Sequence, residues 1–349
     1  MKKSAILILA ATLIGSFGPG VGRAEIYVMN SQSVTQSMTV YADSADGDTA
    51  PIRTLEGPDT GLYRPGGVAI DRVHGEMFLV PDILDEVVNV YPLDADGNQA
   101  PIRSLEGVNT GIVDARAVAV DPVNDELYVT DKATNSVRVF SRTADGNVAP
   151  LRVIEGSNTG LDFILGLFID LTHDEIFVSS GVSNSILVFP RTANGDVEPI
   201  RALEGPSTQL GSNQWIFVSL EHDELYVSQR DGSITVYPRM ADGDMAPVRR
   251  IAGPNTMMQF PQGILLTDDD ELILSDEADK VLVFPRLADG DVAPSRSIVG
   301  AATGLDGPFG LASTRAAEGS VGFAGPLPIF SDGFESGDTS AWTAQQPPP

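Results

Sequence analysis

A sixfold internal repeat constrains the fold of this chain more than any other feature of its sequence. Successive copies start 50, 49, 49, 48 and 47 residues apart. A period of that length is typical of proteins in which each repeat is one supersecondary unit that packs against the next. The sequence therefore predicts one long domain built from six similar units. Each unit contains the tripeptide Ala-Asp-Gly, or Ala-Asn-Gly in the fourth copy, beginning at Ala45, Ala95, Ala144, Ala193, Ala241 and Ala288.

The second copy shows the content of one unit. Four short runs rich in β-branched and aromatic residues, separated by turn residues, span 65–71, 76–80, 87–91 and 101–105. Four such runs per repeat are typical of one blade of a β-propeller. The Asp-Gly and Asn-Gly dipeptides supply the positive φ that a tight hairpin between the third and fourth strands requires. Each unit is thus predicted to be a four-stranded antiparallel sheet.

The two ends of the repeat region complement each other. The first copy lacks an innermost strand, whereas residues 308–313 form an innermost strand with no blade after it. Because an open ring would leave unpaired strand edges, we expect the C-terminal strand to complete the N-terminal blade. The predicted fold class is all-β, a six-bladed β-propeller over residues 25–314 whose ring is closed by a C-terminal innermost strand.

The innermost strands are predicted to be crowded, because one face of them is small in most copies. Gly67, Ala117 and Gly310 illustrate this face, which suits strands packed between neighbouring blades. Phe168, Trp215 and Phe217 interrupt it. Two interpretations stay open: these large side chains fill a gap between the fourth and fifth blades, or Trp215 helps to line a binding surface.

The blade sequence resembles a known repeat. Residues 114–131, DARAVAVDPVNDELYVTD, with 135–140, NSVRVF, are similar to the NHL repeat, and so are residues 166–189. The whole of 25–314 looks like an NHL-type six-bladed propeller from an exported bacterial protein. The resemblance implies the fold; the family includes secreted binding scaffolds, tripartite-motif partners, and a few lyases and lactonase-like hydrolases.

The N-terminal residues predict that the protein is exported. Met1-Lys2-Lys3, an apolar run over residues 5–17, and Gly22-Arg23-Ala24 form a signal peptide over residues 1–24, so the location is predicted to be secreted or periplasmic. No other stretch approaches the roughly 18 apolar residues of a membrane span, so no integral membrane segment is expected in the mature chain. Cysteine is absent. Residues 315–349 are small, polar and glycine-rich, and are expected to form a flexible C-terminal tail.

Charge narrows the classes of partner. The chain has 22 Lys and Arg against 48 Asp and Glu, a formal net charge of −26. A polyanion of this size repels phosphate backbones, so we expect no nucleic acid partner. A protein or a glycan surface remains a suitable partner.

Residues present in every copy are expected to serve the blade rather than a ligand. The acidic turns lack the further ligands of a calcium loop, and His74, His173 and His222 fall in one type of turn. Neither a calcium ligand set of the lactonase-like kind nor a serine-nucleophile elbow is found. We therefore predict no catalytic residue, no metal ligand and no cofactor; a calcium ion in the channel fits the fold but is not indicated. The arginines expected to hold adjacent blades by ion pairing or stacking are Arg53, Arg103, Arg152, Arg201, Arg249 and Arg296.

The loops leading into the innermost strands differ from blade to blade, and aromatic rings beside amides and arginines suit a peptide or glycan. The leading hypothesis is an exported non-enzymatic binding or scaffold protein that uses this variable channel-mouth face. Random loop drift would look the same. The alternatives are a metal-dependent lactonase-like hydrolase or lyase with a central-channel site, and a spacer within a surface assembly. The candidate ligand-binding residues are Arg64, Arg116, Phe163, Gln214, Trp215, Phe260, Gln262 and Phe309.

Overall fold

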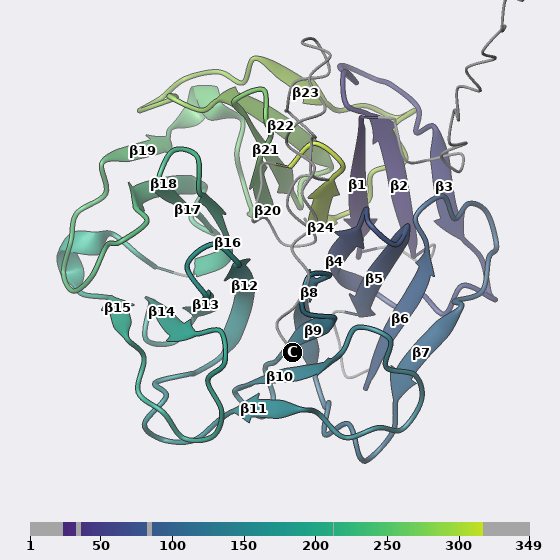
Figure 1. The fold of residues 1–349 in the computed structure, drawn as a ribbon. Coiled ribbons are helices and arrows are strands. Elements are labelled where there is room, and N and C mark those ends of the chain that lie inside the picture. Colours follow the sequence, from purple (N-terminus) through teal and green to yellow (C-terminus); the bar gives the residue numbers. More distant parts are fainter. Residues whose placement is uncertain (1–23, 33–35, 82–85, 212, 317–349) are drawn as a thin grey trace, which may run out of the picture.

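The computed structural model describes residues 24–32, 36–81, 86–211 and 213–316. The strands in this part of the chain form six four-stranded antiparallel sheets, arranged as the blades of a ring (Figure 1). This arrangement confirms the predicted six-bladed propeller. The expected signal peptide, except for its last residue, and the expected tail beyond residue 316 lie outside the described residues.

Each blade follows the same order from the innermost strand outward. Two short 3-10 helices, η1 (Pro206–Thr208) and η2 (Pro254–Thr256), lie in loops between blades. The blades are β24 (Pro308–Ser313), β1 (Glu25–Asn30), β2 (Ser37–Ala42) and β3 (Arg53–Glu56); β4 (Pro65–Asp71), β5 (Glu76–Pro81), β6 (Val87–Pro92) and β7 (Arg103–Glu106); β8 (Ala115–Asp121), β9 (Glu126–Asp131), β10 (Ser136–Ser141) and β11 (Arg152–Ile154); β12 (Ile164–Asp170), β13 (Glu175–Ser180), β14 (Ser185–Pro190) and β15 (Arg201–Leu203); β16 (Asn213–Ser219), β17 (Glu224–Gln229), β18 (Ser233–Pro238) and β19 (Arg249–Ala252); β20 (Pro261–Leu266), β21 (Glu271–Asp276), β22 (Lys280–Pro285) and β23 (Arg296–Ile298).

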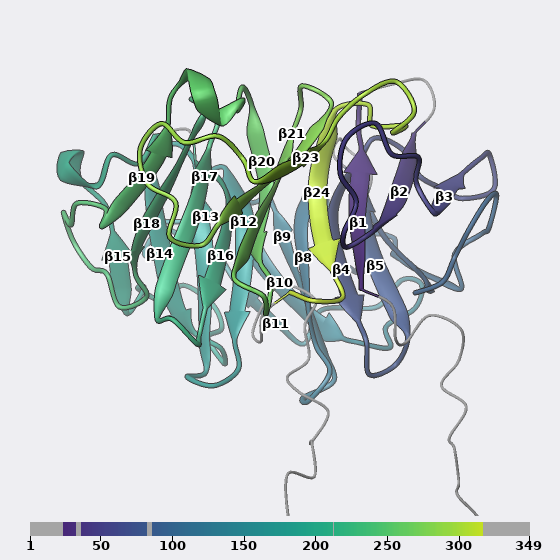
Figure 2. The same cartoon turned by 90° about the horizontal axis from the view of Figure 1, so that it is seen from above.

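The ring closes through the predicted pairing of its two ends. Strand β24 pairs antiparallel with β1, with Tyr27 opposite Ala312 and Val28 opposite Leu311 (Figure 2). The N–H of Thr314 donates to the carbonyl of Glu25 at 3.0 Å. This pairing satisfies the inner edge of β1, as a closed ring requires.

Crowding between the innermost strands explains their small residues. A Cβ on Gly67 would lie 2.7 Å from the carbonyl oxygen of Arg116 on the next strand, so no side chain fits there. Phe168 and Phe217, by contrast, meet edge to face at 5.6 Å between the fourth and fifth blades. For this pair the gap-filling interpretation is confirmed.

The connection between the third and fourth strands corrects one prediction. The glycine has the expected positive φ, 62° at Gly97, but the connection is a long loop rather than a tight hairpin. The N–H of Gly97 donates to the carbonyl of Thr54 at 2.8 Å, and the N–H of Glu56 donates to the carbonyl of Gly97 at 3.0 Å. The turn therefore runs beside the outermost strand of the preceding blade and covers its edge.

The repeated arginines correct a second prediction. Arg152 forms a bidentate pair, at 2.6 and 2.9 Å, with Glu126 of its own blade, so the main contact lies within a blade. A different arginine joins neighbouring blades: Arg191 Nη1 lies 3.1 Å from Glu126 of the preceding blade, and its Nε lies 2.9 Å from Asp174 of its own. Sequence reasoning missed this second set, which recurs just after the third strand as Arg142, Arg191, Arg239 and Arg286.

Candidate functional site at the mouth of the ring

We define the mouth face as the loops leading into the innermost strands, together with the loops joining second to third strands. The final residue of the second strand fixes this face in several blades. Asp131 Oδ2 accepts from the N–H of Val113 at 2.6 Å, and Asp276 Oδ2 accepts from the N–H of Gln259 at 2.7 Å. Because backbone groups are held by buried carboxylates, the loops that carry the candidate residues are positioned before any ligand arrives.

A pairing irregularity begins each innermost strand at the mouth. Regular pairing is interrupted between Ala115 and Val118 in β8 and between Pro261 and Ile264 in β20. Such irregularities redirect side chains and occur often at functional sites. The first residue inside each interruption occupies one equivalent position around the ring, filled by Gly66, Arg116, Leu165, Gln214, Gln262 and Phe309.

One side of the mouth gathers cations around Asp114. Arg116 Nε lies 3.3 Å from Asp114 Oδ1, and Lys132 Nζ lies 3.1 Å from Asp114 Oδ2. Burial, with a smaller contribution from the charge of Arg64, lowers the pKa of Arg116 to about 10. The Lys132 ammonium also lies 5.0 Å from the ring centroid of Phe163. The structure therefore brings two candidate residues, Arg116 and Phe163, close to Lys132, and a third, Arg64, close enough to Arg116 for their charges to interact.

Another part of the mouth is built around Gln262. Its side chain is fully buried, and its Nε2 donates to Glu277 Oε1 at 2.5 Å. Arg230 Nη2 lies 3.1 Å from Glu277 Oε2, and the Arg230 guanidinium lies 5.8 Å from the ring centroid of Phe260. Burial raises the pKa of Glu277, although Arg230 opposes the shift. The Oε1 atom of Gln262 is buried with no hydrogen-bond partner among the described residues.

Trp215 and Phe309 are carried by the two innermost strands on either side of β20. Their rings meet edge to face at 6.0 Å and 82°, and Trp215 is only 7% exposed. Strands β16 and β24, which carry them, flank β20. Trp215 occupies a position that is Gly67, Gly263 or Gly310 in other blades, so its indole is an added packing element of this ring. The side chain of the remaining candidate, Gln214, lies outside the described part.

Two of the candidate aromatics are open to solvent. Phe163 is 47% exposed and Phe260 is 45% exposed, and each is approached by a cation. Flat rings with a charged neighbour offer contact area together with orientation, the combination found in binding hot spots. Sequence reasoning missed Lys132 and Arg230. For Lys132 the available signal was the scarcity of lysine, since only Lys132 and Lys280 follow Lys3 in the sequence.

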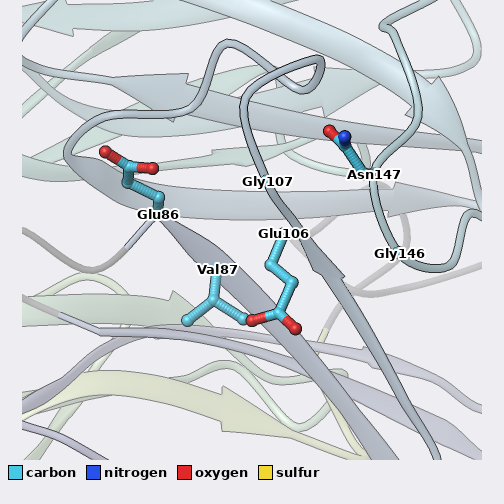
Figure 3. A pocket seen from close by; sticks show the side chains of 6 residues that line it. All are labelled: Glu86, Val87, Glu106, Gly107, Gly146 and Asn147. Atoms are coloured by element: carbon cyan, nitrogen blue, oxygen red, sulfur yellow. The ribbon is translucent and has the colours of Figure 1, made fainter.

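A hollow lies away from the candidate residues, at the seam between the second and third blades. It measures about 550 Å³ and is lined by Glu86, Val87, Glu106, Gly107, Gly146 and Asn147 (Figure 3). The contact of Asn147 with Gly107 recurs at the other seams, for example as Asp196 with Gly156. Because the seam repeats, this part of the hollow serves the ring.

Neither metal ligation nor a membrane span is found in the described residues. No group of three or more His, Asp or Glu side chains there is arranged to hold a metal ion. No described helix has the length and apolar character needed to cross a bilayer. The predicted turn role of histidine is confirmed at His74, whose Nδ1 lies 2.7 Å from Asp71 Oδ2, and at His173, where the same contact to Asp170 is 2.8 Å.

Comparison with solved structures supports the fold. A chain from the nidogen/laminin complex matches with a TM-score of 0.59 and 10% sequence identity, covering 84% of this chain and 98% of that one. The WD40 β-propeller domain of Doa1 matches with a TM-score of 0.53 and 11% identity, covering 80% of each chain. No family model and no curated protein matches the sequence. At these identities the likeness concerns the propeller fold alone.

Proposed function

We propose that this chain is an exported, non-enzymatic binding scaffold of the NHL-propeller type, which recognises a protein or a glycan through the mouth face. One contrast carries the proposal. The outer parts of the blades repeat the same ion pairs, whereas the equivalent mouth position changes from Gly66 to Arg116 to Phe309 around the ring. A constant frame with a variable face is the arrangement of a recognition surface.

Two further features support the proposal. Phe163 and Phe260 are exposed but not isolated, since Lys132 and Arg230 approach their rings. The backbone N–H of Phe260 donates to Asp276 Oδ2 at 3.2 Å, and the backbone N–H of Phe163 donates to Asn135 Oδ1 at 2.7 Å. A preorganised face loses less conformational entropy on binding. The two structural neighbours, one from a nidogen/laminin complex and one a WD40 domain, are compatible with a protein partner.

The test is a screen followed by matched variants. The purified protein is applied to a glycan array and to a peptide-display library, and the affinity of a selected ligand is measured by calorimetry. Phe163→Ala and Phe260→Ala are each expected to weaken binding about tenfold, or about 1.4 kcal/mol. Val123→Ala is the control, because Val123 is 73% exposed in a turn between first and second strands.

Melting temperatures of the three variants should stay close to that of the parent, because all three side chains are exposed. The proposal is contradicted if neither screen selects a ligand. It is also contradicted if Val123→Ala weakens binding of the selected ligand while both phenylalanine variants bind normally.

A further inference from the structure

The face opposite the mouth presents apolar side chains to solvent. We call it the base face, and it is made by the turns between first and second strands and the loops between third and fourth strands. In five blades the residue before the first arginine of the fourth strand is a large aliphatic that is 46–58% exposed. The sixth blade has Ser295 there. The five aliphatic residues are Ile52, Ile102, Leu151, Ile200 and Val248.

The docked turns make two of the seams between blades different from the others. The residue before the Ala-Asp-Gly turn is exposed and apolar in two adjacent blades, as Met240 in the fifth and Leu287 in the sixth. Because each turn docks on the preceding blade, Met240 belongs to the seam of Ile200, and Leu287 to the seam of Val248. We call these four residues the apolar patch. The equivalent turn residues of the other four blades are polar: Ser44, Asp94, Thr143 and Thr192.

Hydrogen bonds hold the two sides of each of these seams together. Arg249, which follows Val248, donates from Nη2 to the backbone carbonyl that precedes Leu287, at 3.5 Å. In the other seam the N–H of Gly243 donates to the carbonyl of Ala202 at 2.8 Å. Since four seams keep a polar residue on one side, the repeat does not require apolar residues on both sides. The apolar patch is therefore a departure from the repeat that is open to a binding role.

The described chain ends on the same face and close to this patch. Strand β24 runs from the mouth face to the base face. Beyond it, the carbonyl of Arg315 accepts from the N–H of Asp268 at 3.0 Å, and Arg315 Nε lies 3.0 Å from Asp268 Oδ1. Two residues further along that turn, Asp270 Oδ1 lies 3.1 Å from Nε of Arg286, the residue before Leu287. One turn of the sixth blade therefore separates the end of the described chain from the apolar patch.

The sequence that follows contains a suitable occupant. Residues 317–349 lie outside the described part, and between Glu318 and Asp332 they carry no charge. The apolar run Pro-Leu-Pro-Ile-Phe, residues 326–330, begins ten residues after Ala316. Ten extended residues span about 33 Å. The innermost and outermost strands of a blade are three strand spacings apart, about 14 Å, so the run is long enough in its tether to reach the patch.

We infer that residues 326–330 of this same chain dock on the apolar patch. A second copy is the less suitable occupant, because each copy has a net charge of −26 and the turns beside the patch expose Asp242 and Asp289. An uncharged run avoids this repulsion, and its attachment gives it an effective concentration in the millimolar range. The inference replaces the expectation of a flexible tail for this run alone. It leaves the mouth free and does not depend on the proposed function.

Thiol labelling of the full-length protein tests the inference. Because the chain has no cysteine, Leu287→Cys supplies one thiol in the patch, and Thr143→Cys supplies one at the equivalent exposed position of the third blade. Each is combined with the native tail and with the pair Ile329→Ser and Phe330→Ser. Mass spectrometry follows the reaction with N-ethylmaleimide. The tail substitutions are expected to speed labelling of Leu287→Cys about tenfold, since a thiol covered nine-tenths of the time reacts about tenfold more slowly. Labelling of Thr143→Cys should not change.

A second measurement leaves the tail unchanged and alters the patch. The full-length protein is digested briefly with chymotrypsin, and cleavage after Phe330 is followed by mass spectrometry. Met240→Ser combined with Leu287→Ser is expected to speed this cleavage about fivefold, because the undocked fraction of the run increases. Val123→Ser is the matched control, since Val123 is an exposed aliphatic on the base face of the third blade; it should leave the cleavage rate unchanged.

Three outcomes overturn the inference. The first is labelling of Leu287→Cys that does not respond to the tail substitutions, or that responds no more than labelling of Thr143→Cys. The second is cleavage after Phe330 at the parental rate in the variant with Met240→Ser and Leu287→Ser. The third is protection of Leu287→Cys that increases with protein concentration, which would assign the patch to a second copy of the chain.

Discussion

At the scale of single residues, a glutamate at the start of the second strand is the main charged feature of each blade. The Glu126 carboxylate accepts hydrogen bonds from Nη1 and Nη2 of Arg152 within its blade. Its Oε2 lies 3.1 Å from Nη1 of Arg191 of the next blade. Two guanidinium groups on one carboxylate make this residue the point where a blade and its neighbour meet. An arginine of the next blade also pairs with Glu76, Glu175 and Glu224. The pair with an arginine of the same blade is present in all six: Glu25, Glu76, Glu126, Glu175, Glu224 and Glu271.

These glutamates predict acid sensitivity. Burial works to raise the pKa of Glu76, Glu126, Glu175 and Glu224, but the arginine hydrogen bonds and charges outweigh it, so each pKa lies below the usual 4.5. A lowered folded-state pKa means that the unfolded chain binds more protons, so this stability is present above pH 4.5 and is lost as pH falls through the folded pKa. Burial raises the pKa of Asp43 and Glu277, so these two carboxyl groups change stability with pH in the opposite direction.

Glu126→Gln tests the prediction. At pH 7 the variant is expected to be about 1–3 kcal/mol less stable, because the substitution removes the charge that two partly buried arginines share. Between pH 4.5 and 3 its melting temperature should fall less steeply than that of the parent. Glu86→Gln, at an exposed position, is the control. Parallel melting curves for Glu126→Gln and the parent would contradict the argument.

At the scale of elements, the Ala-Asp-Gly turn binds each blade to the preceding one. Its Asx side chains accept backbone N–H groups of the preceding blade: Asn194 Oδ1 from Val153 at 3.1 Å and Asp196 Oδ1 from Asn158 at 2.6 Å. This contact requires a glycine at position 156, because a Cβ there would collide with the side chain of Asp196. The φ of Gly156, 126°, also favours glycine. The segment that reverses the chain direction therefore also connects neighbouring blades by hydrogen bonds.

Two glycines of one seam separate the docking contact from turn strain. Gly195 also has a positive φ, 78°, but nothing lies within 4 Å of its missing Cβ. Gly195→Ala is expected to cost about 1 kcal/mol from backbone strain alone. Gly156→Ala should cost at least about 2 kcal/mol more, since strain and collision add. Chemical denaturation measures both, and adding Asp196→Ala should recover part of the Gly156→Ala loss; no recovery would show that the collision is unimportant.

At the scale of the whole molecule, closure of the ring joins the two ends of the described chain. Strand β24 supplies the inner edge of the first blade, and Arg315 extends the seam through ion pairs to Asp43 at 3.3 Å and to Asp268 at 3.0 Å. Asp43 stands in the first blade where four other blades have an arginine. The charge order is thus reversed at this seam, and the C-terminal segment supplies the missing cation.

A disulfide across the closure should stabilise the ring strongly. Val28 lies opposite Leu311 between β1 and β24, and opposite Thr39 between β1 and β2. Because the chain has no cysteine, either pair of Cys substitutions can form only one intramolecular disulfide. The Val28→Cys, Leu311→Cys bond closes a far longer loop than the Val28→Cys, Thr39→Cys bond, and is expected to stabilise by about 3 kcal/mol more.

Melting temperatures with and without a thiol reductant measure the gain. The reduced forms correct for any loss of packing at these buried positions. If the bond across the closure stabilises no more than the short one, the ends of the chain remain associated in the unfolded state, and closure is not the constraint described above.

The sequence by itself determined the number of blades, the four strands in each, the positive φ of the turn glycines and the pairing of β24 with β1. These features depend on periodicity and turn chemistry, which neighbouring residues carry. Only the tertiary structure decided that the Gly97 turn docks on the preceding blade, that Arg191 rather than Arg152 mainly bridges blades, and that Trp215 packs on Phe309. Such contacts join residues from different repeats, so they depend on how far each blade is rotated from the next, and no local pattern encodes that angle.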